Sequence, residues 1–477
     1  MSSPLESNRR VHPLAILILC ALLPALLFTG IWRWAEARRV LLPPEADIAE
    51  PALPAPMITP VLSLRRAPQT LANSTSRSLL AASLTSVAQL AGDTSCLTVA
   101  IDHHQVFESG AAIAVTPASN LKLLVASVAL EVLGPDYTFS TQLKGVVTDG
   151  VISGDLYFVG GGDPLLSTAN YPATQKYSPT NVTPIEDLVA KLVDAGVTTI
   201  QGNVVGDDSR FDNERFAPGW GTSISGTEAG PIGALMVNDA TRVLSANSTI
   251  RFGDPAIGAA TNLISLLQSA GISVGGTAVS GKAAADLTLL AEQPSAPLSS
   301  VLAEMLNTSD DNTAEVILKE LGVHAGVVGS RQAGIEVVTS TLAARGIDTT
   351  QLVMRDGSGL DSADRASCAM MVQILERESL TNPIGIGLPI AGRTGTLAHE
   401  FSGTSMVDRL HAKTGSLRNA KALSGYVTTP LGEIEFSMIL NLANASDPAK
   451  FRPLWSALAT AFDSYPAGPP AALLQPL

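Results

Sequence analysis

Two residue types that could perform acyl transfer lie three positions apart, at Ser119 and Lys122. A serine hydroxyl becomes a strong nucleophile only when a neighbouring group accepts its proton. The surrounding segment, residues 116–134, has a proline-led turn followed by an apolar run, which predicts a helix on which residues three apart are neighbours. We therefore expect Lys122 to reach the Ser119 hydroxyl and act as its base. A Ser-x-x-Lys string arises about once by chance in such a chain, so further motifs must support this interpretation.

A second motif, Lys413-Thr414-Gly415-Ser416, comes just before two β-type runs near the end of the chain. Chance would produce a Lys-Thr-Gly string in about one chain in twenty of this composition, so this motif is more informative. On a strand edge, Gly415 would let a ligand backbone approach closely. The ammonium and hydroxyl groups beside it could bind a carboxylate. The alternative is an ordinary exposed strand edge.

A third polar cluster, Ser309-Asp310-Asp311-Asn312, leads into a predicted helix. Such residues commonly cap helices by accepting hydrogen bonds from the first backbone amides, and a capping role is compatible with a catalytic one. The string DGSGL at residues 356–360 is turn-forming and could equally be structural.

Composition excludes several classes of function. The 477 residues carry a net charge of −13, which argues against nucleic-acid binding because phosphate attraction needs a basic surface. The six histidines show no metal-ligand spacing, so we predict no metal and no cofactor.

The N-terminal region predicts export or membrane attachment. Residues 13–32 contain no charged side chain and match the length of a membrane-spanning helix, which favours a retained anchor and an extracytoplasmic body. The alternative is a cleaved signal peptide ending near Ala35-Glu36-Ala37. Outside this segment, in which Cys20 is an apolar filler, only Cys96 and Cys368 remain. They could pair in an oxidising compartment or stay as buried thiols.

The distribution of apolar periodicity and turn residues predicts a divided catalytic domain. The expected parts are a tail and anchor (1–40), a Pro/Ala-rich linker (41–69), the first part of the catalytic domain (70–140), an inserted β-rich domain (141–255), the second part of the catalytic domain (256–463) and a disordered tail (464–477).

The three motifs, in this order and with a long insert after the first, resemble the serine penicillin-binding proteins. The similarity is greatest to the low-molecular-mass (class C) D-alanyl-D-alanine carboxypeptidase/endopeptidase branch and covers most of the chain after residue 70. Further strings that share it are GGGDPLL (160–166), the segment around Pro218-Gly219-Trp220, SAPLSSVLAEML before Ser309, DGSGL (356–360), LPIAGRTGTL (388–397) and AKTGSL (412–417).

The resemblance implies an α+β fold in which helices pack on a five-stranded antiparallel sheet, as in serine β-lactamases and transpeptidases. It implies a peptidoglycan stem peptide ending in D-Ala-D-Ala as substrate and β-lactams as acylating inhibitors. The implied roles are nucleophile for Ser119, base for Lys122, proton relay for Ser309, electrostatic support for Lys413, carboxylate binding for Thr414 and Ser416 beside Gly415, and an oxyanion hole formed by the backbone N–H groups of Ser119 and Ser416.

One position departs from the family pattern. The second motif should read Ser-x-Asn, but Asp311 stands in the third place and Asn312 comes one residue later. An aspartate lacks the amide donor that would contact substrate, and its charge should favour the charged forms of Lys122 and Lys413. Either the loop is adjusted so that Asn312 reaches the site, or activity is reduced.

Three functions therefore compete. The leading one is a D,D-carboxypeptidase, with possible endopeptidase activity, that forms an acyl-enzyme on Ser119. The second is a catalytically impaired envelope scaffold that binds peptidoglycan, which the aspartate at position 311 motivates. A β-lactamase or esterase on the same fold would require an extra general base, for which the sequence offers no clear candidate.

Overall fold

The computed structural model describes residues 13–38, 68–177, 179–245 and 248–467. The chain divides into two units, Met1–Val61 and Leu62–Leu477. The first contains helix α1 (Pro13–Ala37), which has a proline in its interior. None of the helices in the described ranges has both the length and the apolar character needed to cross a membrane. The anchor predicted at residues 13–32 is therefore not supported.

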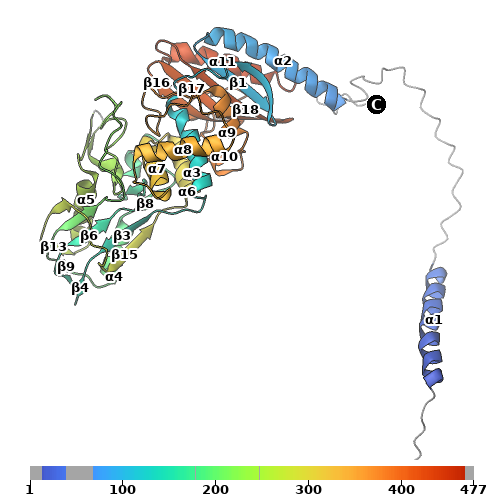
Figure 1. The fold of residues 1–477 in the computed structure, drawn as a ribbon, viewed down its shortest axis with the longest axis horizontal. Helices are drawn as coiled ribbons and strands as arrows, with labels where there is room; N and C mark the ends of the chain where they lie inside the picture. Colours follow the sequence, from blue (N-terminus) through green and yellow to red (C-terminus); the bar gives the residue numbers. More distant parts are fainter. Residues whose placement is uncertain (1–12, 39–67, 178, 246–247, 468–477) are drawn as a thin grey trace, which may run out of the picture. The chain divides into compact units, whose positions relative to one another are not determined.

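A five-stranded antiparallel sheet forms the centre of the second unit, in the order β16-β17-β18-β1-β2 (Figure 1). Its strands come from both ends of the unit, so the sheet closes only when the last strands pair with the first. This is the antiparallel sheet predicted for the catalytic domain. The bounds are β1 Cys96–Ile101, β2 His104–Ser109, β16 Leu410–Leu417, β17 Ala420–Thr429 and β18 Gly432–Leu440.

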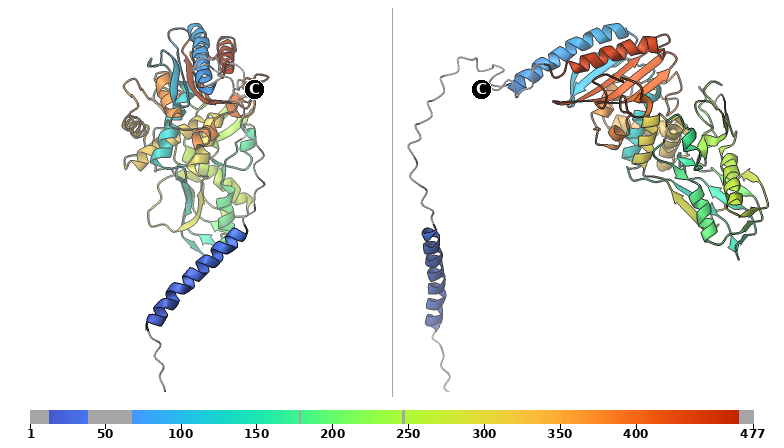
Figure 2. Two further views of the ribbon diagram at one scale, coloured as in Figure 1. Left: turned by 90° about the vertical axis from the view of Figure 1, so that its right-hand side faces the viewer. Right: turned by 180° about the vertical axis from the view of Figure 1, so that it is seen from behind.

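Helices cover both faces of this sheet. Helices α2 (Pro68–Ala91) and α11 (Pro448–Asp463) lie side by side on one face, where they bury an apolar core with the strands (Figure 2). A second core on the opposite face joins the sheet to a helical cluster. The helices of this cluster are α3 (Leu121–Val132), α6 (Leu298–Thr308), α7 (Asp311–His324), α8 (Arg331–Ala344), α9 (Cys368–Leu375) and α10 (Pro383–Gly387).

The chain between α3 and α6 forms the β-rich insert. Its main sheet has the order β14-β10-β6-β3-β15 and mixes parallel with antiparallel pairs. Its last strands lie beyond residue 255, the predicted end of the insert. The strands are β3 Ser140–Lys144, β6 Leu156–Val159, β10 Val204–Asp207, β14 Ala278–Ser280 and β15 Leu289–Pro294, with helices α4 Glu186–Asp194 and α5 Pro255–Ser269 packed on them.

Short strands complete the insert. A four-stranded sheet has the order β13-β9-β5-β4, and two ribbons are formed by β11-β12 and β7-β8. The bounds are β4 Val147–Thr148, β5 Val151–Ile152, β7 Leu166–Ser167, β8 Thr183–Pro184, β9 Thr199–Ile200, β11 Thr241–Ser245, β12 Ser248–Arg251 and β13 Ser273–Val274. Single 3₁₀ turns are η1 Ala118–Asn120, η2 Pro172–Thr174, η3 Asn238–Ala240 and η4 Gly395–Leu397. The predicted linker, apart from residues 68 and 69, and the predicted tail from residue 468 lie outside the described residues.

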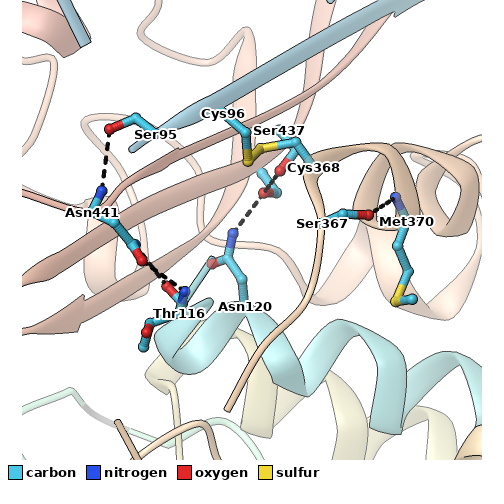
Figure 3. Close-up of a disulfide and its surroundings, with 10 residues drawn as sticks. Ser95, Cys96, Thr116, Asn120, Ser367, Cys368, Met370, Ser437 and Asn441 are labelled. Atoms are coloured by element: carbon cyan, nitrogen blue, oxygen red, sulfur yellow. Dashed lines mark hydrogen bonds between the residues drawn. A yellow bond between two sulfur atoms is a disulfide. The ribbon is translucent and has the colours of Figure 1, made fainter. Parts of the chain in front are cut away.

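A disulfide joins the central sheet to the helical cluster. Cys96 begins β1 and Cys368 begins α9, and the two are bonded across 272 positions of sequence (Figure 3). The sequence left this pairing open. Beside it, Asn441 accepts a hydrogen bond from the backbone N–H of Thr116 (2.8 Å) and donates one to its carbonyl (3.2 Å). These links hold the segment before η1 against the sheet.

Candidate active site

Ser119 lies in the tight turn η1, directly before α3. Ala118, the residue before it, adopts a left-handed conformation with φ of 48°. On the other side, the buried Asn120 amide donates a hydrogen bond to Ser424 Oγ of β17 at 2.6 Å. Ser119 is therefore fixed between the central sheet and the amino-terminal end of a buried helix, where the helix dipole favours negative charge.

Lys122 points back from the first turn of α3 to Ser119, as its spacing predicts. Its Nζ is 3.0 Å from Ser119 Oγ, 2.7 Å from Asp311 Oδ1 and 2.7 Å from the carbonyl oxygen of Ser358. The side chain is fully buried. An ammonium group has three protons to donate, and here each has an acceptor. The nucleophile and its predicted base are thus in direct contact.

Ser309 and Lys413 form a second serine and lysine pair on the other side of the site. Ser309 ends α6 in a left-handed conformation with φ of 66°, and its Oγ accepts a hydrogen bond from Lys413 Nζ at 2.8 Å. Burial, followed by repulsion from Lys122, holds the pKa of Lys413 well below its usual range. The attraction of Asp311 opposes this shift but does not overcome it. The contribution of Asp311 to the pKa of Lys413 therefore has the predicted direction, but burial and Lys122 outweigh it.

Asp311 and Asn312 point in different directions. Asp311 occupies the third place of the motif and pairs with Lys122. Asn312 is buried and turned toward the insert, where its Oδ1 accepts from Gly230 N at 2.8 Å and its Nδ2 donates to Asp239 Oδ1 at 2.9 Å. The loop is not adjusted to bring Asn312 to Lys122. Its role in this structure is to join the helical cluster to the insert, and the departure at Asp311 stands.

The DGSGL turn contributes a contact that the sequence did not predict, since the Ser358 carbonyl accepts from Lys122. Two backbone N–H groups of the turn, at Gly357 and Ser358, donate to the buried Glu315 carboxylate at 2.8 and 2.9 Å. Arg331 in turn donates to Glu315 at 2.9 Å.

A Cβ at Gly359, whose φ is 81°, would lie 2.0 Å from the Ala118 carbonyl oxygen. The glycine-rich turn therefore fits directly against η1.

The Lys-Thr-Gly-Ser motif lies on β16, an edge strand of the central sheet. A Cβ at Gly415 would lie 2.8 Å from the Pro117 carbonyl oxygen, so only glycine permits this approach to η1. Thr414 Oγ1 donates to Thr396 Oγ1 at 2.8 Å. Ser416 is exposed at the open end of the motif.

One cleft of about 1580 Å³ connects these groups with the insert. Residues from the three motifs lie on its wall together with residues of the insert and of the segments that follow β16. Representative lining residues are Ser119, Ser309, Asp311, Asn312, Thr414 and Ser416 from the motifs, Tyr171, Lys176, Thr227, Asp239 and Arg251 from the insert, and Glu400, Lys421 and Trp455 from later segments. In the part of the chain that the structure describes, no group of three His, Cys, Asp or Glu side chains is placed to hold a metal ion.

The family follows from comparison with known proteins. A sequence profile described as D-Ala-D-Ala carboxypeptidase 3 (S13) family matches residues 77–249 and 240–461. The chain belongs to this family. It is 29% identical over 406 residues to a D-alanyl-D-alanine carboxypeptidase of Actinomadura sp. (strain R39), which covers 68% of this chain and 73% of that relative. It is 32% identical over 361 residues to a carboxypeptidase of Mycobacterium tuberculosis, and the match covers 73% of this chain and 76% of that relative.

The fold also has a known counterpart. The crystal structure of penicillin binding protein 4 from Haemophilus influenzae is similar with a TM-score of 0.67 and 20% identity, over 82% of this chain and 99% of that one. This confirms the predicted transpeptidase-like α+β fold, and membership of the S13 family makes the chain a peptidase. The family and fold predicted from the motifs are therefore confirmed.

Proposed function

We propose that the chain is a serine D,D-carboxypeptidase, with endopeptidase activity on the same site, that forms an acyl-enzyme on Ser119. The observation that carries the proposal is the 3.0 Å contact between Lys122 Nζ and Ser119 Oγ on the wall of a large cleft. The Lys413–Ser309 contact supplies the second pair that the family resemblance implies. The substrate class is a peptidoglycan stem peptide ending in D-Ala-D-Ala.

Acylation would proceed as follows. Ser119 Oγ attacks the penultimate D-alanine carbonyl while Lys122, in its neutral form, takes the hydroxyl proton. The oxyanion is held by the backbone N–H groups of Ser119 and Ser416, each typically contributing about 3 kcal/mol. A proton passes through Ser309 to the leaving amine, the C–N bond breaks and D-alanine departs. Water then attacks the ester and restores the Ser119 hydroxyl.

Asp311 favours a second candidate function, an envelope scaffold with impaired turnover. Its carboxylate lies 2.7 Å from Lys122 Nζ, the proposed base, and stands where the family pattern has an amide that can donate to the substrate. We favour the enzyme because Lys122 contacts Ser119 directly and the second serine–lysine pair, Ser309 with Lys413, is also formed. The scaffold would bind the same stem peptides without releasing D-alanine.

The location we propose is extracytoplasmic, with β-lactams as covalent inhibitors. The Cys96–Cys368 disulfide supports this, because such bonds persist in oxidising compartments. In addition, a β-lactam is bound in a crystal structure of the similar protein from Haemophilus influenzae. The proposal does not depend on a membrane anchor.

Release of D-alanine from an N-acylated peptide ending in D-Ala-D-Ala tests the proposal, with Ser119→Ala as the matched variant. We expect turnover by the wild-type protein and a loss of at least about 10³-fold in the variant. A cross-linked muropeptide substrate measures endopeptidase activity in the same assay. A wild-type protein that binds the peptide without releasing D-alanine would instead establish the scaffold function.

A further inference from the structure

Lys421 lies beside the last residue of the Lys-Thr-Gly-Ser motif and has no role so far. It pairs directly with Ser416 across the antiparallel strands β16 and β17, so both side chains are on the same face of the sheet. Lys421 Nζ donates to Ser416 Oγ at 3.3 Å. Both residues line the cleft that contains Ser119. Lys421 is therefore a cation placed at the open end of the motif.

The surroundings of Lys421 keep it in place without neutralising it. Its Nζ lies 4.4 Å from the ring centre of Phe451 and 5.0 Å from that of Trp455, both on α11. Aromatic faces at this distance attract a cation. None of the ion pairs among the described residues includes Lys421, and the carboxylate of Glu400 pairs with Arg452 at 2.9 Å. The aromatic side chains position the ammonium group and leave its charge available to a ligand.

The two lysines of the catalytic motifs are less available to an anion than Lys421. Lys122 is buried and paired with Asp311. Lys413 is buried, donates to Ser309 and to the Thr414 carbonyl, and has a lowered pKa. Thr414 and Ser416 offer only neutral hydroxyls to a carboxylate. Charge-assisted hydrogen bonds are about twice as strong as neutral ones, so a cation beside Ser416 would strengthen carboxylate binding.

We propose that Lys421 is a specificity-determining residue that binds the terminal carboxylate of the substrate together with the Ser416 hydroxyl, and so selects peptides with a free carboxylate over their amides. The inference rests on the proposed function and adds the requirement that the leaving residue carry a free carboxylate. In the complex the carboxylate replaces Ser416 as an acceptor for Lys421 Nζ or shares it with Ser416. No covalent step involves Lys421.

The selectivity should depend on pH. Burial is the main cause that lowers the pKa of Lys421 to about 8, and the charged groups that face it are Glu400, which raises the pKa, and Arg452 and Lys176, which lower it. Lys421 is therefore charged below about pH 8 and loses its charge as the pH rises through that value. A bound carboxylate moves this loss to higher pH because it favours the charged amine. Preference for the free carboxylate should fall in alkaline solution.

The test compares an N-acylated peptide ending in D-Ala-D-Ala with the same peptide ending in D-Ala-D-alaninamide. Lys421→Gln should raise KM for the acid about 10-fold, change kcat by less than about 2-fold, and leave kcat/KM for the amide unchanged. Lys421→Arg should keep the preference. Lys450→Gln, which removes the same charge from an exposed position at the start of α11, should behave as wild type.

An acid-to-amide ratio of kcat/KM that is the same in Lys421→Gln and wild type would overturn the inference. If the variant does not fold, the wild-type protein alone tests the inference. Its acid-to-amide ratio of kcat/KM should fall between about pH 7 and pH 9, and a constant ratio would contradict the proposed role of Lys421. A wild-type protein that hydrolyses neither peptide would refute the proposed function itself, so the two failures are distinguishable.

Discussion

At the scale of single residues, the most important feature of the site is the negative charge of Asp311 beside Lys122. Lys122 donates to Ser119, Asp311 and Ser358 at once, so the ammonium form satisfies all its protons in the resting protein. Asparagine at the same place would keep an acceptor oxygen for Lys122 and add an amide donor for the substrate carbonyl. The aspartate therefore stabilises the resting arrangement more than the reacting one.

Replacing this charge should increase turnover. We expect Asp311→Asn to raise kcat/KM for a D-Ala-D-Ala peptide by about 5- to 10-fold at neutral pH, because the ion pair with Lys122 would be removed and an amide donor for the substrate carbonyl added. Asp194→Asn, which makes the same change at an exposed position of α4, should leave kcat/KM unchanged. A loss of activity in Asp311→Asn would show instead that the carboxylate takes part in the reaction.

At the scale of elements, the site depends on the close fit of β16, η1 and the DGSGL turn. Gly415 and Gly359 both meet the turn before α3 at distances that exclude a side chain. The fit places Ser119 between the strand edge and the helical cluster. A small displacement of any of these elements would separate Ser119 from the backbone N–H of Ser416 and so weaken the proposed oxyanion hole.

Gly415→Ala tests this fit. The added Cβ would approach the Pro117 carbonyl oxygen to 2.8 Å and Ala118 Cβ to 3.1 Å, so η1 or β16 must shift. We expect a loss of at least about 10-fold in kcat/KM and about 1–3 kcal/mol in the free energy of unfolding. Gly154→Ala is the control, because a Cβ there meets no atom within 4 Å. Equal behaviour of the two variants in activity and denaturant unfolding would disprove the packing argument.

The parts of the site that depend on short sequence spacing can be predicted from the sequence, and the parts that depend on contacts between distant segments cannot. Ser119 and Lys122 share one helical face, and the Lys-Thr-Gly string is local, so short spacing was enough to predict both. The Ser358 carbonyl and the Glu315 carboxylate that holds its turn act through contacts between distant segments, and neither residue type nor spacing indicates them. The inward position of Asp311 rather than Asn312 likewise depends on Asn312 bonding to the insert.

At the scale of the whole second unit, the disulfide joins parts of the catalytic domain that lie on either side of the insert. Cys96 and Cys368 close a loop of 272 residues between the sheet and the helical cluster. Cross-links that close long loops restrict the unfolded chain most. The bond therefore stabilises the assembly of a domain whose two parts are far apart in sequence.

Removal of the disulfide should lower stability more than activity. We expect the double variant Cys96→Ser/Cys368→Ser to lose about 2–5 kcal/mol in the free energy of unfolding, measured by denaturant titration. At a temperature where the variant is still folded, it should retain most of its turnover. Among the described residues, neither sulfur atom forms a hydrogen bond with a side chain of the three motifs. Cys20→Ser, at the exposed free cysteine, serves as the control. An unchanged unfolding midpoint in the double variant would contradict this role.

The central claim is that Ser119 is the acylated nucleophile. A fluorescent penicillin incubated with the folded protein, followed by proteolysis and mass spectrometry, locates the acyl group directly. We expect one adduct per chain, carried on Ser119 and absent from Ser119→Ala. An adduct on another residue, or equal labelling of wild type and Ser119→Ala, would contradict it.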